Sequence, residues 1–167
     1  MIYIIDANNL AGKLGLIYEK NFDKELIKII RKYFKNKNHE INLVFDSLDP
    51  MGDKYREENI TIIYTPKDNY YKSADDKIIE LSKINKEKDL VVITDDIGII
   101  EQVKKINLEF VTKIKLEKTT SFAEKINSFY TQGLSENKNN STSNNRKSGL
   151  DKEDIEELNK ELLQIWS

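Results

Sequence analysis

Short apolar runs with almost no polar interruption alternate along this chain with segments of helical periodicity. The runs are residues 2–5, 41–45, 60–64, 90–93 and, more weakly, 108–111. An apolar run without polar alternation suits a strand that is covered on both faces, as parallel strands are. Between the runs, apolar residues recur at helical spacing in residues 23–35, 74–84 and 97–105. The alternation predicts an α/β fold with a mainly parallel sheet of about five strands, flanked by helices.

The composition of the chain changes after residue 131. A further helix is expected at 121–130, because Ser121 and Glu124 have the spacing of a capping box. Residues 132–149 are polar, rich in Asn and Ser and without apolar periodicity, which is typical of a flexible linker. Beyond them, four apolar residues recur at helical spacing: Ile155, Leu158, Leu162 and Ile165. We therefore expect a compact domain over 1–131, a linker over 132–149 and an amphipathic C-terminal helix over 150–167. That helix would dock on its own domain, on a second copy or on another protein.

Length and composition exclude several classes of protein. A chain of 167 residues can form one hydrophobic core with an appendage, but it is too short for two ordinary domains. Its 27 Lys and Arg residues face 29 Asp and Glu residues, so any surface for a polyanion must be local. The absence of cysteine excludes disulfides, thiolate metal sites and cysteine nucleophiles. No basic N-terminal region precedes a long apolar stretch, and no apolar run approaches the roughly 20 residues that cross a bilayer. We expect a cytoplasmic protein without a membrane partner.

Acidic residues follow the apolar runs where a ligand site is expected. In an open α/β sheet the ligand crevice lies beyond the carboxyl ends of the strands. Four segments of the chain place acids there: Asp6, Asp46, Asp75 with Asp76, and Asp95 with Asp96. Each acid alone has a simpler explanation as a turn former or as a residue of a helix N-terminus. Together they would repel one another unless a cation neutralised them, and oxygen-only ligands favour Mg²⁺ or Mn²⁺ over zinc.

The four acidic motifs also carry a family resemblance. "IIDANN", "LVFDS", "SADDKIIE" and "VVITDDIGI", in this order and spacing, resemble the NYN domains of the PIN-like ribonuclease superfamily, the YacP-like branch in particular, over residues 1–131. In that family the matching positions form a metal-binding nuclease site, which here implies Asp6, Asn9, Asp46, Asp75 and Asp96. Family members often have Gly-Tyr where this chain has Ala7 and Asn8. Asp76 and Asp95 stand beside matched acids, so both are further candidate metal ligands.

The resemblance implies a metal-dependent endoribonuclease, a hydrolase of phosphodiester bonds in single-stranded RNA, with ribosome-associated mRNA as one candidate context. Contacts to RNA are expected at the rim of the crevice, through phosphate-binding lysines and stacking tyrosines. The candidates are Lys13, Lys67, Lys72, Lys77, Tyr70 and Tyr71. Tyr64 is expected in the core, and His39 on the surface rather than as a catalytic base. The alternative is a non-catalytic PIN-like module that binds RNA or a ribosomal partner.

Overall fold

The structure is a computed structural model that describes residues 1–46, 52–66 and 73–139, with the backbone alone over 133–139. In these ranges one sheet contains six strands: β1 (Ile2–Asp6), β2 (Glu40–Asp46), β3 (Asp53–Glu57), β4 (Ile60–Thr65), β5 (Leu90–Ile93) and β6 (Lys115–Glu117). The helices are α1 (Ala7–Lys13), α2 (Phe22–Phe34), α3 (Ala74–Ile84), α4 (Ile97–Phe110) and α5 (Thr119–Asn139). The predicted α/β fold is confirmed.

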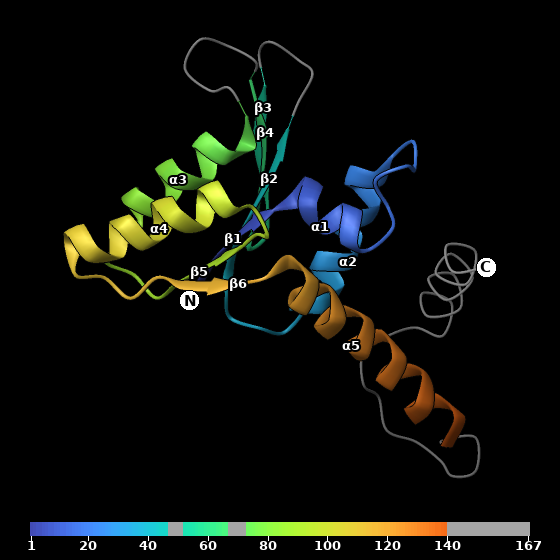
Figure 1. Cartoon of the computed structure of the whole chain (residues 1–167). Coiled ribbons are helices and arrows are strands. Elements are labelled where there is room, and N and C mark those ends of the chain that lie inside the picture. Colours follow the sequence, from blue (N-terminus) through green and yellow to red (C-terminus); the bar gives the residue numbers. More distant parts are fainter. Residues whose placement is uncertain (47–51, 67–72, 140–167) are drawn as a thin grey trace. The chain divides into compact units, whose positions relative to one another are not determined.

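Helices cover both faces of the sheet. α3 and α4 lie on one face, and α1 and α2 lie on the other (Figure 1). On the first face Ile4 and Val92 of the strands pack with Ile78 of α3 and Val103 of α4. The second face is more aromatic and includes Tyr3, Phe34 and Phe122, with the Phe34 and Phe122 rings stacked. Burial on both faces explains why the central strands read as continuous apolar runs.

The strand order places β1 at a switch point of the sheet. The order is β3-β4-β2-β1-β5-β6, and the pairs β1–β2, β2–β4, β1–β5 and β5–β6 are parallel. The chain runs from β1 outwards through β2 to β4, and then returns to β5 on the other side of β1. The carboxyl ends of β1 and β5 therefore border the position where ligands bind in open α/β sheets.

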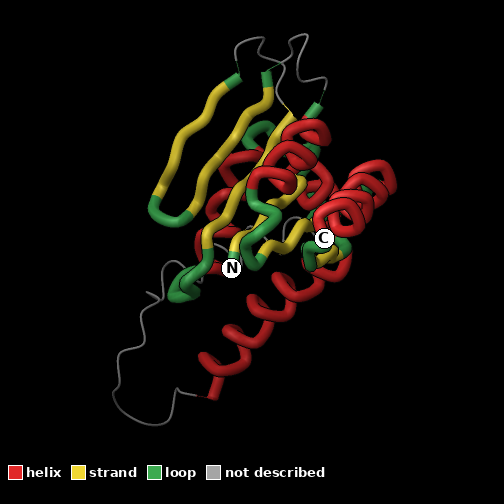
Figure 2. The backbone as a smooth tube through the Cα atoms, turned by 90° about the vertical axis from the view of Figure 1, so that its left-hand side faces the viewer, coloured by secondary structure: helices red, strands yellow, loops and turns green. Residues whose placement is uncertain are grey.

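The sheet has an antiparallel edge that the apolar pattern does not predict. β3 pairs antiparallel with β4, and Figure 2 shows the two strands joined by a short turn. All of β3 except Glu57 is exposed, so its sequence, DKYRE, carries no burial pattern. An edge strand needs main-chain pairing and only one neighbour, which explains why a count of apolar runs missed it.

The prediction of a strand at 108–111 is wrong. These residues complete α4 and its C-cap, and the sixth strand is β6, a short edge strand further along the chain. The buried stripe of Ile99, Val103 and Ile106 holds α4 against the sheet. Continuing a helix adds one hydrogen bond for each further residue, and this outweighs the local strand preference of the LEFV segment.

The last described helix is longer than expected. α5 runs from Thr119 to Asn139, so residues 132–139 are helical rather than part of a linker. The chain divides into two compact units, Met1–Ile126 and Asn127–Ser167, at a point within this helix. The expected domain end at 131 stays a prediction, and the expected helix over 150–167 lies outside the described residues. Among the described helices, none is both long and apolar enough to cross a membrane.

Candidate active site

Asp6 lies at the centre of the candidate site, where β1 ends and α1 begins. Its Oδ1 accepts a hydrogen bond from the backbone N–H of Asn9 (3.0 Å), and its Oδ2 accepts one from the Thr94 hydroxyl (3.1 Å). The residue is only 6% exposed. Burial, with a smaller contribution from the charge of Asp75, raises the pKa of Asp6 to about 6, although both hydrogen bonds favour the charged form.

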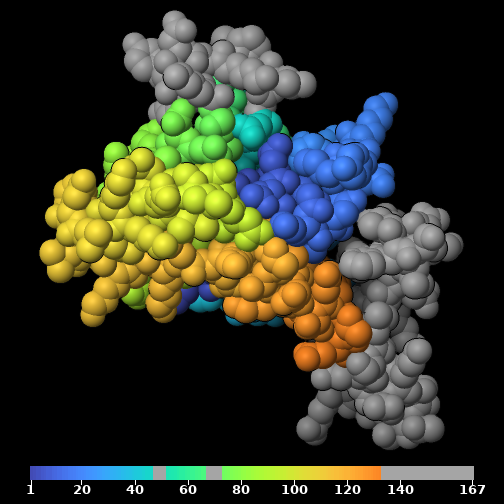
Figure 3. Space-filling model, in the orientation of Figure 1, coloured from blue at the N-terminus to red at the C-terminus, as the bar shows by residue number. Residues whose placement is uncertain are grey.

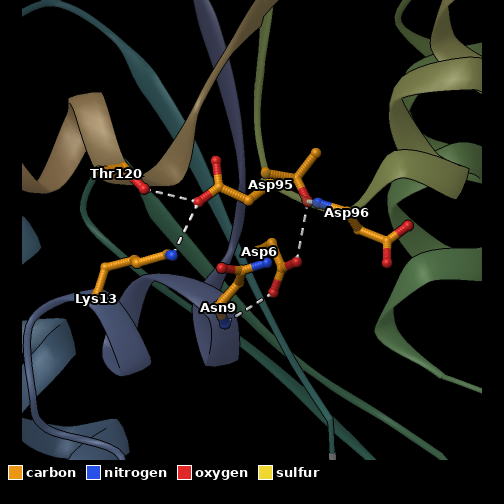
Figure 4. Close-up of polar contacts among 7 residues, drawn as sticks. Asp6, Asn9, Lys13, Asp95, Asp96 and Thr120 are labelled. Atoms are coloured by element: carbon orange, nitrogen blue, oxygen red, sulfur yellow. Dashed lines mark hydrogen bonds and ion pairs between the residues drawn. The ribbon is translucent and has the colours of Figure 1, made fainter.

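Thr94 joins the ends of β1 and β5. While its hydroxyl donates to Asp6, its Oγ1 accepts the backbone N–H of Asp96 (3.0 Å). Asp96 in turn caps α4, since its Oδ1 accepts the backbone N–H of Ile99 (3.0 Å). In Figure 4 the side chains of Asp6, Asn9 and Asp96 lie around this junction. The buried Thr94 hydroxyl thus links Asp6 at the end of β1 to Asp96 after the end of β5.

Asp46 and Asp75 approach the same edge from β2 and α3. Asp46 Oδ1 accepts the backbone N–H of Ala74 (2.7 Å), and Ser73 caps the backbone N–H of Asp75 (3.3 Å). The pKa of Asp75 is raised by desolvation first and then by the charges of Asp96 and Asp46. Exposed Asp76 adds a smaller effect of the same sign. Figure 3 shows α1, α3 and the start of α4 on one surface, with α4 beside α1 and α3 above them.

Asp95 has a different environment from Asp96. Its Oδ2 contacts Lys13 Nζ of α1 (3.4 Å) and accepts a hydrogen bond from the Thr120 hydroxyl of α5 (2.9 Å), as Figure 4 shows. Burial alone would raise the pKa of Asp95, but the Thr120 hydrogen bond and Lys13 together lower it. Asp95 therefore ties α1 and the start of α5 to the end of β5. Asp96 is the member of the pair whose charge acts on Asp75.

The expected RNA-contacting residues are only partly described. Lys13 pairs with Asp95, and Lys77 pairs with Glu80 within α3 (3.0 Å). Four others lie outside the described residues: Lys67, Tyr70, Tyr71 and Lys72. Their role at the rim stays a prediction.

Tyr64 and His39, the two residues set aside from the site, are both half-buried. Tyr64 stacks on Phe45 and donates its hydroxyl to Asp23 (2.8 Å). His39 packs on Tyr3 just before β2 begins, at the opposite end of that strand from Asp46. In the described structure, neither side chain has a hydrogen bond or ring contact with the acids of the candidate site.

The metal site itself is not formed in the described residues. Across 1–46, 52–66 and 73–139, no three His, Cys, Asp or Glu side chains lie close enough together to hold an ion. Three carboxylates are partly engaged at helix N-termini, each through one oxygen that accepts a backbone N–H: Asp6 and Asp96 as N-caps, and Asp46 from the end of β2. The ligand assignment therefore stays a prediction, although the oxygen donors match what Mg²⁺ and Mn²⁺ prefer.

Two residues of the site were not singled out from the sequence. Thr94 acts through the hydroxyl that bridges Asp6 and Asp96, and Asn8 through an amide oxygen that accepts the N–H of Asp46 (3.1 Å). A Thr before the acids of "VVITDD" was the available signal for the first. The sequence marks Asn8 only as a departure from the Gly-Tyr of many family members and gives no sign of its role, because its partner is distant in the chain.

The fold and the site together define an α/β protein that carries a buried acid on its central strand and further acids at neighbouring strand ends, at the switch point where open sheets bind ligands. The family model of the YacP-like NYN domain matches residues 3–162, and the chain belongs to this family. NYN domains are part of the PIN-like nuclease superfamily, so the family gives the chain a nuclease-like, RNA-related function. Comparisons with curated proteins and with solved structures gave no match.

Proposed function

We propose that this protein is a Mg²⁺- or Mn²⁺-dependent endoribonuclease that hydrolyses phosphodiester bonds of single-stranded RNA. The observation that carries the proposal is that acids from separate segments lie at one edge of the sheet, near enough for their charges to act on one another. Desolvation is the largest cause of the raised pKa of both Asp6 and Asp75; the charge of Asp75 adds to the first, and the charges of Asp96 and Asp46 add to the second. Such an arrangement is unfavourable in the absence of a cation and becomes favourable when one binds.

Each acid has a distinct expected role. Asp6, Asp75 and Asp96 are the expected metal ligands, and Asp46 binds the ion directly or through water. Asn9 keeps Asp6 oriented, because its backbone N–H donates to the Asp6 carboxylate. A bound divalent ion supplies charge stabilisation at the phosphodiester and lowers the pKa of water for in-line attack. The lysines and tyrosines of the rim are expected to hold the strand of RNA.

A cleavage assay that compares the wild type with substitutions at two neighbouring acids tests the proposal. Labelled single-stranded RNA incubated with the full chain and Mn²⁺ should give internal cleavage products, and EDTA should abolish them. Asp96→Asn should lower the rate by at least about 100-fold, the scale of losing one metal ligand or its supporting shell. Asp95→Asn makes the same chemical change one residue away, at a carboxylate held by Lys13 and Thr120. It should retain most of the activity.

The competing function is a non-catalytic module that binds RNA or a ribosomal partner. Equal background cleavage by the wild type and Asp96→Asn, together with RNA binding by both, would establish that reading instead. Ribosome-associated mRNA as substrate and a cytoplasmic location are part of the proposal. A comparison of cleavage of free RNA with cleavage of translating ribosomal complexes tests the first of these.

A further inference from the structure

Asn8 occupies the place where the β1–β2 ladder would otherwise continue. The last pair of that ladder is Asp6 with Val44, so continuing the register would bring position 8 opposite Asp46. At position 7 the main chain has already turned into α1. The side-chain Oδ1 of Asn8 nevertheless accepts the Asp46 N–H at 3.1 Å. A side chain thus replaces a main-chain acceptor of the sheet.

The direction of the neighbouring hydrogen bonds supports this substitution. At the start of β2, the N–H of Glu40 donates to the main-chain oxygen of Met1 (3.1 Å). Alternate residues of a strand direct their N–H groups to the same neighbour, so the Asp46 N–H also points towards β1. Because β1 ends at Asp6, that N–H would have no main-chain acceptor on β1 without Asn8.

The contact continues into the helix that carries Asp75. Asp46 Oδ1 accepts the N–H of Ala74 at 2.7 Å, and this hydrogen bond holds the first residue of α3. Asn8 therefore reaches α3 through Asp46 and connects three segments that are distant in sequence. An amide suits position 8 better than a carboxylate, because it accepts the hydrogen bond without adding a negative charge beside Asp6 and Asp46.

We propose that Asn8 is a positioning residue that holds the end of β2 and the start of α3 and so sets the placement of Asp46 and Asp75. Its consequence for metal binding rests on the proposed function. The hydrogen-bond relay itself, from Asn8 to Asp46 to Ala74, does not. Residues that orient metal ligands typically change metal affinity by about 10–100-fold when removed, although they never touch the ion.

Amide exchange in the metal-free full chain tests the relay by NMR. Asn8→Ala should speed exchange of the Asp46 and Ala74 N–H groups by about tenfold, because the first hydrogen bond of the relay is lost. Asn8→Asp keeps an acceptor and should keep both groups protected. Asn42→Ala is the matched control, because Asn42 also bridges β1 and β2, through the Tyr3 carbonyl (3.5 Å), away from the acids. It should leave both exchange rates unchanged.

Calorimetric titration of Mn²⁺ then separates positioning from simple stability. Asn8→Ala should weaken Mn²⁺ binding by about 10–100-fold, and Asn42→Ala should match the wild type. Unchanged exchange at Ala74 in Asn8→Ala overturns the proposal, as does unchanged Mn²⁺ affinity in that variant. If the wild type binds no Mn²⁺ and cleaves no RNA, the proposed function fails, and the exchange rate at Ala74 decides the relay alone.

Discussion

At the scale of single residues, the site consists of carboxylates that serve the fold and the proposed chemistry at once. Asp6 and Asp96 each cap a helix, and both bind the Thr94 hydroxyl group. The Asp6 carboxylate accepts a hydrogen bond from this hydroxyl, and the Asp96 backbone N–H donates one to it. These bonds explain how a buried acid such as Asp6 is tolerated. They only partly offset its burial, since the pKa of Asp6 is still raised to about 6.

Asp6 should make the metal-free protein less stable as the pH rises. Its pKa is raised from 3.8 to about 6 by burial, so between these values the folded state binds the proton more tightly than the unfolded state. Stability from this group is therefore present below pH 4 and is lost through pH 6, by about 3 kcal/mol. Asp6→Asn should remove this loss and be more stable than the wild type at pH 7.5. Urea unfolding of both proteins in EDTA, at pH 4 and at pH 7.5, measures this change. If the unfolding free energy changes equally with pH in the wild type and in Asp6→Asn, the raised pKa of Asp6 is contradicted.

Thr94 should be needed for both stability and activity. Thr94→Val keeps the shape of the side chain but leaves Asp6 Oδ2 and the Asp96 N–H without their partner. We expect a loss of about 1–3 kcal/mol in unfolding free energy, because a buried polar group is left unpaired. The cleavage rate should fall as well. Thr94→Ser restores the hydroxyl and should recover most of both. If Thr94→Val equals the wild type in both measurements, the bridge has no energetic role.

At the scale of elements, the acids are placed by where helices begin. α1 starts directly after β1, α4 starts after the short segment 94–96 that follows β5, and α3 starts beside the end of β2. The N-terminus of a helix favours negative charge, so the three helix starts support acids at this one edge. The C-terminal ends of these helices do not place acids at the site. α4 ends at a residue with a left-handed backbone conformation.

The end of α4 should be improved by glycine. Val111, its C-cap residue, has a left-handed backbone (φ 53°, ψ 40°) and is 88% exposed. This conformation costs a β-branched residue about 1–2 kcal/mol, and glycine adopts it freely. Val111→Gly should raise the unfolding free energy by about 1 kcal/mol, or the melting temperature by about 2–4 °C. Val111→Ala keeps the Cβ and should gain less. A less stable glycine variant would show that the valine side chain makes a stabilising contact.

At the scale of the whole molecule, the proposed site predicts a response to divalent ions. A ligand that binds only the folded state stabilises it by about 2.7 kcal/mol at 100 times its dissociation constant. Millimolar Mg²⁺ or Mn²⁺ should therefore raise the melting temperature of the full chain. Asp96→Asn should lose the response, whereas Asp89→Asn, at an exposed acid just before β5, should keep it. No shift with either ion would count against the metal site.

Also at this scale, the expected C-terminal helix predicts a difference between the full chain and a chain that ends at residue 139. Residues 150–167 carry an apolar stripe, and a helix of this length is marginal in water unless that stripe is buried. Lost self-association in the shorter chain, measured by light scattering, would support docking on a second copy. A loss of monomer stability would support docking within the chain. If neither changes, the segment binds another protein or has no docking role.

The sequence by itself determined the central strands, the helix α3 and the edge at which the acids lie. Continuous apolar runs and helical periodicity are local signals of burial, and parallel strands with helical crossovers all end at the same side. Tertiary structure decided which strands form the edges of the sheet and which distant residues the polar side chains of the site contact. β3 and β6 exist through pairing, Asp95 differs from Asp96 through Lys13 and Thr120, and Asn8 acts through Asp46. Each of these depends on strand register and on which distant segment lies alongside, and no local pattern of apolar and polar residues encodes that.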